Sequence, residues 1–179
     1  SSGYAGTRSE VKLLSDVDLA QAERISTGLA EFDRVLGWGI VRGSVVLIGG
    51  APGAGKSTIL LQVIASVADK GFPVLYVSGE ESLQQIAERA YRLRLKASSI
   101  KMLTETSVQS ICDVVDAEKP ALVIIDSIQV MHTVDSDTAP GSVSQVRESA
   151  SYLTQYAKRN NISIFMVGHV TKDQSLAGP

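Results

Sequence analysis

Short apolar runs alternate with amphipathic segments along most of this chain, and the alternation predicts its secondary structure. Short apolar runs are typical of strands buried on both faces, and we predict strands at 45–49, 73–78, 100–103, 121–126 and 162–168. The segments between them have helical spacing of apolar residues, which predicts helices at 27–36, 56–70, 82–95, 107–118 and 142–159. Ser or Thr lies near the start of four of these helices, where its hydroxyl can cap free backbone N–H groups.

This order of elements predicts an α/β fold with a mainly parallel, twisted sheet and helices on both faces. Ligands of such sheets bind at the carboxyl ends of the strands. Functional side chains should therefore follow the apolar runs directly, and several unusual polar residues do so.

The first 24 residues differ from the rest of the chain. They begin with the polar, aperiodic sequence SSGYAGTRSE and continue into a short amphipathic stretch, VKLLSDVDLAQAERI. We interpret residues 1–24 as a linker or interface arm and residues 25–179 as one domain, since 179 residues suit a single core.

Composition and charge narrow the class of protein. Hydrophobic residues make up 44% of the chain, as in globular domains, and its formal net charge of −2 gives no global attraction for nucleic acid. One cysteine allows no internal disulfide, and no apolar run approaches the roughly 18 residues of a membrane span. We expect a cytoplasmic protein with no membrane partner. The clearest basic run of the chain consists of Arg89, Arg92, Arg94, Lys96 and Lys101. We favour its interpretation as a solvated helix face; contact with adenine, with another subunit or with DNA are the alternatives.

The most informative motif follows the first predicted strand. Residues 50–58 read GAPGAGKST and match the Walker A pattern of a P-loop, between a strand and a helix. Its glycines let backbone N–H groups surround an anion, and the helix start adds a positive dipole end. We predict that ATP or ADP binds here, with Lys56 on the β- and γ-phosphates and the Ser57 hydroxyl on Mg²⁺. The predicted nucleotide-binding residues are Gly50, Ala51, Pro52, Gly53, Ala54, Gly55, Lys56, Ser57 and Thr58.

Three further polar residues follow predicted strands. Asp126 ends LVIID and can hold Mg²⁺ through a water, although such an Asp is otherwise a helix cap or turn residue. Glu80 can orient and deprotonate the water that attacks the γ-phosphate, whereas Glu81 is better explained by the positive first turn of the next helix. His169 could contact the γ-phosphate and report its loss, although a lone histidine is usually an ordinary surface or core residue.

Sequences around these residues resemble the RecA-type ATPase core and, more closely, the bacterial RadA (Sms) family of DNA repair proteins. The resemblance covers about residues 9–179, in RISTGLAEFDRVLG, LYVSGEESLQQIAERAYRL, IDSIQVM, PGSVSQVRE and GHVTKDQSLAGP. It implies a RecA-like P-loop NTPase in which Lys56, Ser57 and Asp126 hold nucleotide and Mg²⁺. It also implies that Glu80 activates water and that His169 occupies the position that senses the γ-phosphate.

The family resemblance implies partners that the residues alone barely reveal. Such a protein is a hexameric, DNA-stimulated ATPase with helicase activity on single-stranded DNA, and it extends heteroduplex by branch migration with RecA during homologous recombination and DNA repair. Residues 131–147 fall where RecA-like proteins have their first DNA-binding loop. Without the resemblance, the candidate residues are more simply helix caps and solvated charges: Gly141, Ser142, Ser144, Gln145, Arg147 and Lys172.

The sequence also departs from the family pattern. It has no N-terminal four-cysteine zinc motif, no KNRFG motif and no C-terminal Lon-protease-like domain, so we expect an excised ATPase core. If the KNRFG motif supplies motor-specific or interface chemistry in the family, this core should bind nucleotide yet be defective in DNA-coupled work. Trp38 and Gln174 stand where the family usually has glycine. For Trp38 we favour ordinary loop packing over contact with a neighbouring surface.

Two other functions stay open from the residues. A P-loop protein can phosphorylate a small molecule, but no arginine-rich lid insertion is evident, and a glutamate after the second strand suits water better than an alcohol. A nucleotide-switched interaction module with weak hydrolysis is the third alternative.

Overall fold

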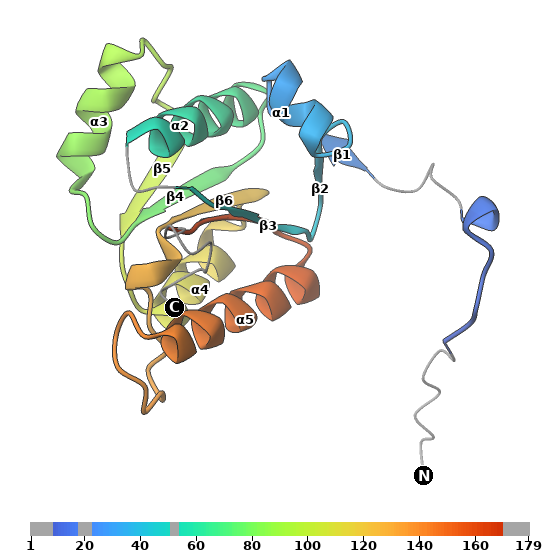
Figure 1. Ribbon diagram of the computed structural model, residues 1–179. Helices are drawn as coiled ribbons and strands as arrows, with labels where there is room; N and C mark the ends of the chain where they lie inside the picture. The colour runs from blue at the N-terminus through green and yellow to red at the C-terminus, as the bar shows by residue number, and fades with distance from the viewer. Residues whose placement is uncertain (1–8, 18–22, 51–53, 170–179) are drawn as a thin grey trace.

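A five-stranded parallel sheet forms the centre of the molecule in the computed structural model, which describes residues 9–17, 23–50 and 54–169 (Figure 1). Neighbouring strands are parallel throughout this sheet. Along the described chain, the last strand of this sheet lies between the first strand of the sheet and the strand that ends in Asp126. The strand order is β3 (Val45–Ile48), β7 (Ser163–Val167), β6 (Leu122–Asp126), β4 (Val74–Ser78) and β5 (Ile100–Thr104).

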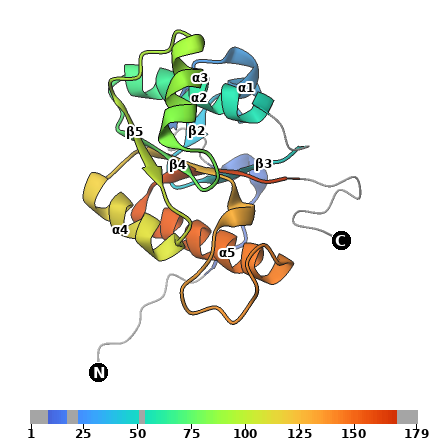
Figure 2. The same ribbon diagram turned by 90° about the vertical axis from the view of Figure 1, so that its left-hand side faces the viewer.

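Helices cover both faces of the sheet, as predicted. Figures 1 and 2 show α2 (Ala54–Asp69) and α3 (Leu83–Arg92) on one side, and α4 (Val108–Glu118) and α5 (Val143–Asn160) on the other. Alternate strand residues enter two separate apolar cores, because successive side chains of a strand point to opposite faces. The predicted α/β fold with a parallel sheet is therefore confirmed. None of the helices among the described residues is both long and apolar enough to cross a bilayer.

Serine caps start three of the helices where the sequence predicts. Ser82, Ser107 and Ser142 each accept a hydrogen bond from the backbone N–H three residues later, at 3.2 to 3.4 Å. Ser82 and Gln85 also form a capping box, in which the Gln85 side chain accepts from the Ser82 backbone N–H. Local hydrogen bonds that need no distant partner thus set these helix starts.

The first helix begins later than predicted. Helix α1 (Ala30–Val35) does not include Thr27, because Gly28 has a φ of +79° and so breaks the helical conformation. Thr27 instead donates to the Asp33 carboxylate from its backbone N–H, at 2.7 Å, and from its hydroxyl, at 2.5 Å. Burial raises the pKa of Asp33, but hydrogen bonds from Ser26 and Thr27 outweigh it and leave that pKa below its usual value.

The structure adds short elements that the apolar pattern does not predict. Strands β1 (Arg24–Ile25) and β2 (Ile40–Val41), which precede and follow α1 in the sequence, form a small antiparallel pair. Within the described residues, single turns of 3₁₀ helix occur at Leu14–Asp16 and Ile128–Val130. These elements are too short to have a hydrophobic period. The described part of the predicted arm exposes its large apolar side chains, which are Val11, Leu13, Leu14 and Val17. The division into arm and core stays a prediction.

Trp38 occupies a strained position on the surface. Its φ is +79°, in the left-handed region that favours glycine, and its side chain is 72% exposed, so little packing compensates. We expect Trp38→Gly to raise the free energy of unfolding by about 0.5–1 kcal/mol, after allowing for the greater backbone freedom of unfolded glycine. Urea unfolding measures this gain. Trp38→Ala keeps the Cβ atom and should show none; equal stability of the two variants would contradict the strain.

Candidate nucleotide-binding site

Lys56 joins two strand ends at the carboxyl edge of the sheet. Its Nζ donates to the carbonyl oxygen of Gly50 at 2.8 Å and to that of Gly168 at 3.2 Å. Gly50 follows β3 with a φ of +152°, and a Cβ atom there would lie 3.4 Å from the Lys56 side chain. The ammonium group is therefore held beside the ends of β3 and β7, where a parallel sheet binds its ligands.

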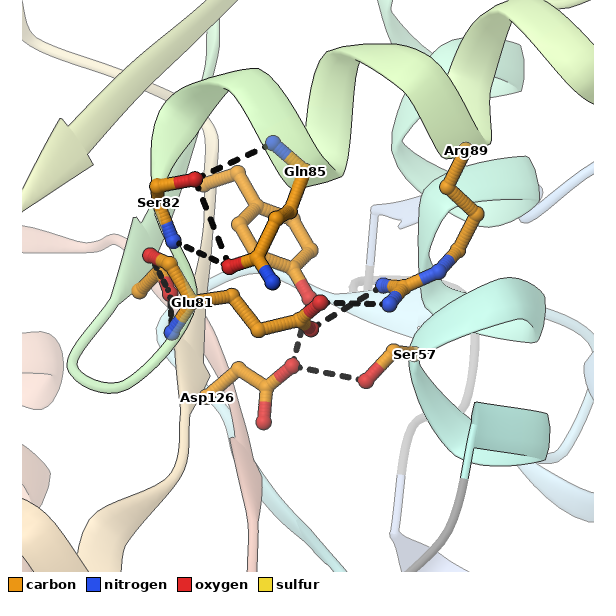
Figure 3. A network of polar contacts seen from close by, with 8 residues as sticks. Ser57, Glu81, Ser82, Gln85, Arg89 and Asp126 are labelled. Atoms are coloured by element: carbon orange, nitrogen blue, oxygen red, sulfur yellow. Dashed lines mark hydrogen bonds and ion pairs between the residues drawn. The ribbon is translucent and has the colours of Figure 1, made fainter.

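Ser57 and Asp126 are in direct contact (Figure 3). Ser57 lies in the first turns of α2, and its hydroxyl donates to Oδ2 of Asp126, the last residue of β6, at 2.9 Å. The Tyr76 hydroxyl, from the neighbouring strand β4, donates to the same oxygen at 2.6 Å. The fold thus brings together two predicted metal-site residues separated by 69 positions in the chain.

The chemistry of this pair fits Mg²⁺. A hydroxyl and a carboxylate supply oxygen ligands, which Mg²⁺ prefers, and it usually keeps several waters and phosphate oxygens around a small number of protein groups. No group of three or more His, Cys, Asp or Glu side chains able to hold a metal ion occurs within 9–17, 23–50 and 54–169. The Ser57 hydroxyl and the Asp126 carboxylate suit an ion whose other ligands are waters and phosphate oxygens.

Glu80 lies on the turn after β4, beside the strand that carries Asp126. The backbone N–H of Gly79 donates to the carbonyl oxygen of Asp126 at 3.0 Å. A Cβ atom on Gly79 would meet Cγ2 of Val130 at 2.3 Å, so this close approach requires glycine. Glu80 itself is exposed and lines a cavity of about 600 Å³ at the ends of β4 and β5.

Glu81 has a different role from the one that the sequence predicts. Helix α3 begins at Leu83 after the Ser82 cap, so Glu81 precedes the helix and does not lie in its first turn. Its carboxylate forms a two-point ion pair with Arg89, with N–O distances of 3.1 and 2.5 Å (Figure 3). The favoured interpretation of Arg89 as part of a solvated face is therefore wrong. Hydrogen bonding to Glu81 raises the pKa of Arg89.

The ion pair is expected to stabilise the turn that carries Glu80. Its side chains are partly buried, with 17% of Arg89 and 30% of Glu81 exposed. We expect Arg89→Ala to lower the free energy of unfolding by about 1–2 kcal/mol, because Glu81 loses both hydrogen bonds. Urea unfolding tests this against Arg92→Ala, which removes an exposed arginine from the same helix and should cost less than about 0.5 kcal/mol. Equal losses would show that the ion pair adds nothing.

His169 lies at the same edge of the sheet. The carbonyl of the preceding residue, Gly168, accepts from Lys56, and the carbonyl of His169 accepts from Nε2 of Gln129 at 3.4 Å. The side chain of His169 is half-buried. Its position is compatible with contact to a phosphate, and γ-phosphate sensing stays a prediction. Some predicted site residues lie outside the described part of the chain: Ala51, Pro52, Gly53 and Lys172.

The candidate DNA-binding residues surround the start of α5. Ser142 caps the helix, and Gln145 is buried, with its amide bonded to the hydroxyls of Thr133 and Thr138 at 3.3 Å. These two side chains therefore hold the 131–142 loop against the helix. Of the candidate residues in this region, Gly141, Ser144 and Arg147 are exposed, and their contact with DNA stays a prediction.

Sequence reasoning missed Tyr76 and the pairing of Arg89 with Glu81. A signal for Tyr76 was present, because a tyrosine inside a buried strand needs a hydrogen-bond partner for its hydroxyl. Its partner could not be read from the sequence, since the pairing depends on the order of β4 and β6 in the sheet.

A parallel α/β sheet with a P-loop lysine, serine and strand-end aspartate at its carboxyl edge defines a nucleotide-binding ATPase domain. The AAA domain family model matches residues 7–175, and the chain belongs to this family.

The chain is similar to bacterial proteins named DNA repair protein RadA. It is 58% identical over 179 residues to the protein of Haemophilus influenzae, 57% over 180 residues to that of Escherichia coli, and 48% over 166 residues to that of Bacillus subtilis. These alignments cover 99%, 99% and 93% of this chain, respectively. The chain spans only 39%, 39% and 36% of the lengths of these relatives. The resemblance to the RadA family is therefore confirmed.

Proposed function

We propose that this chain is the ATP-binding and ATP-hydrolysing core of a DNA repair protein. The observation that carries the proposal is the 2.9 Å hydrogen bond between Asp126 and Ser57, the residue that follows Lys56 in the P-loop motif. These three side chains converge from α2 and β6 at the edge where a parallel sheet binds ligands. Membership of the AAA domain family and similarity to RadA proteins support the same function.

Each residue has a distinct part in the proposed reaction. Lys56 neutralises the β- and γ-phosphates, while Ser57 and Asp126 hold Mg²⁺, which neutralises charge on the phosphates when bound. Glu80 orients a water molecule and takes its proton as the water oxygen bonds to the γ-phosphorus. The bond from that phosphorus to the bridging oxygen breaks, which gives ADP and inorganic phosphate. His169 contacts the γ-phosphate and detects its loss.

The proposed whole protein is a DNA-stimulated motor. In it, hexamers of the core hydrolyse ATP on single-stranded DNA and drive branch migration and heteroduplex extension with RecA in recombination. The RadA names of the similar proteins support a role in DNA repair. The exposed Gly141, Ser144 and Arg147 offer one surface for phosphate contact.

The decisive experiment measures phosphate release by the full-length protein with and without single-stranded DNA. We expect release of inorganic phosphate that rises when DNA is added. A phosphorylated small molecule in place of free phosphate would favour a kinase. Unchanged turnover in Glu80→Gln, with ATP binding intact, would favour a nucleotide-switched interaction module.

A further inference from the structure

Tyr76 links the apolar core to the candidate metal site. It lies in the middle of β4, is 0% exposed, and belongs to the core cluster between the sheet and α2. Its hydroxyl reaches Oδ2 of Asp126 at 2.6 Å. Packing thus fixes the Tyr76 ring, while the hydroxyl of the same side chain contacts Asp126 in the candidate nucleotide site.

The hydroxyl has little value for packing alone. Its neighbours along β4, Leu75 and Val77, are apolar, and phenylalanine would fill nearly the same space as Tyr76. Burying a hydroxyl is unfavourable unless it is hydrogen-bonded. The 2.6 Å contact with Oδ2 of Asp126 supplies that hydrogen bond.

The two donors to Asp126 lie in different surroundings. Ser57 belongs to the P-loop motif at the start of α2, whereas Tyr76 is enclosed in the core. Both donate to Oδ2, so neither of them occupies Oδ1. A donor fixed by the core sets the rotation of the carboxylate and keeps its other oxygen available for a ligand.

We propose that Tyr76 is a positioning residue for metal-dependent nucleotide binding. Its hydroxyl holds the Asp126 carboxylate with Oδ2 toward Ser57 and leaves Oδ1 to accept from a water of the bound Mg²⁺. Partners that orient metal-site carboxylates commonly affect metal affinity about 10- to 100-fold. This inference rests on the proposed nucleotide-binding function.

The test is a Mg²⁺ titration of nucleotide binding by the chain. A fluorescent, non-hydrolysable ATP analogue reports affinity in EDTA and at increasing Mg²⁺ concentrations. We expect Tyr76→Phe to raise the half-saturating Mg²⁺ concentration about tenfold and to leave affinity in EDTA within about twofold. In an Asp126→Asn background, the same substitution should have no further effect on the Mg²⁺ dependence.

Tyr156→Phe is the matched control. The Tyr156 hydroxyl also donates to a carboxylate, that of Asp116, and to the Cys112 carbonyl at 3.2 Å, but these residues lie on α4 and α5 across the sheet. This variant should titrate with Mg²⁺ like the wild-type chain.

Three results would overturn the proposal. The first is an unchanged Mg²⁺ midpoint in Tyr76→Phe, and the second is the same shift of the midpoint in the Asp126→Asn background. The third is a parallel loss of affinity in EDTA or loss of the fold, which would show that the hydroxyl only supports packing. Failure of the proposed function is distinguishable from these results, because the wild-type chain itself would then show no Mg²⁺-dependent binding of the analogue.

Discussion

Lys56→Ala is expected to lower the affinity of the chain for ATP by about 100-fold or more. The ammonium group lies where the ends of β3 and β7 meet, held by the carbonyls of Gly50 and Gly168. A phosphate oxygen bonds an ammonium more strongly than a neutral carbonyl does, because both groups are charged. Loss of two charge-assisted hydrogen bonds of about 1.5 kcal/mol each gives a change of this size.

A nucleotide titration by calorimetry measures this change in the chain. Lys96→Ala is the matched control, since the Lys96 side chain is 82% exposed and forms a surface ion pair with Asp69 at 3.5 Å. It should bind ATP like the wild-type chain. Urea unfolding of both variants separates lost binding from lost structure. A folded Lys56→Ala chain with wild-type affinity would remove the lysine from the site.

Glu80→Gln is expected to slow ATP hydrolysis by about 100- to 10,000-fold, the usual contribution of a general base. Glutamine keeps the size of the side chain but cannot accept the proton of the attacking water. ATP affinity should change less than about twofold, because Lys56, Ser57 and Asp126 hold the nucleotide. Single-turnover hydrolysis and equilibrium binding by the full-length protein measure the two effects separately.

Two neighbouring glutamates serve as comparisons for Glu80. Glu88→Gln changes an exposed residue of α3 and should leave hydrolysis unchanged. Glu81→Gln weakens the ion pair with Arg89, so we expect a loss of stability with a smaller loss of hydrolysis than in Glu80→Gln. A larger loss of hydrolysis in Glu81→Gln would assign the general base to Glu81 instead.

The strands were predictable because they are buried on both faces. The LVIID and VLYVS segments are buried and largely apolar up to the polar residues that end them, and each adopts the strand expected of it. Helix starts were predictable where a local serine cap decides them, as at Ser82 and Ser142. The start of α1 was not, because it depends on the conformation of Gly28 and the contact of Thr27 with Asp33.

The candidate site was predictable only as a set of residues. The spacing of the P-loop identifies Lys56 and Ser57, and the ends of apolar strands identify Glu80 and Asp126. Their contacts depend on which strands are neighbours. β7 is the last of the described strands along the chain but pairs with β3, the first strand of the sheet, which brings the carbonyl of Gly168 to Lys56.

The sequence by itself determined the fold class, the order of the elements and the residues able to bind a nucleotide, because short-range patterns of burial, capping and loop composition decide them. Only the tertiary structure decided that Tyr76 contacts Asp126 and that Arg89 pairs with Glu81. The Tyr76 contact joins residues 50 positions apart in the chain, on strands whose pairing no local pattern specifies. The Arg89 pair depends on how α3 turns its side chains back toward the sheet, because packing of the whole core sets that orientation.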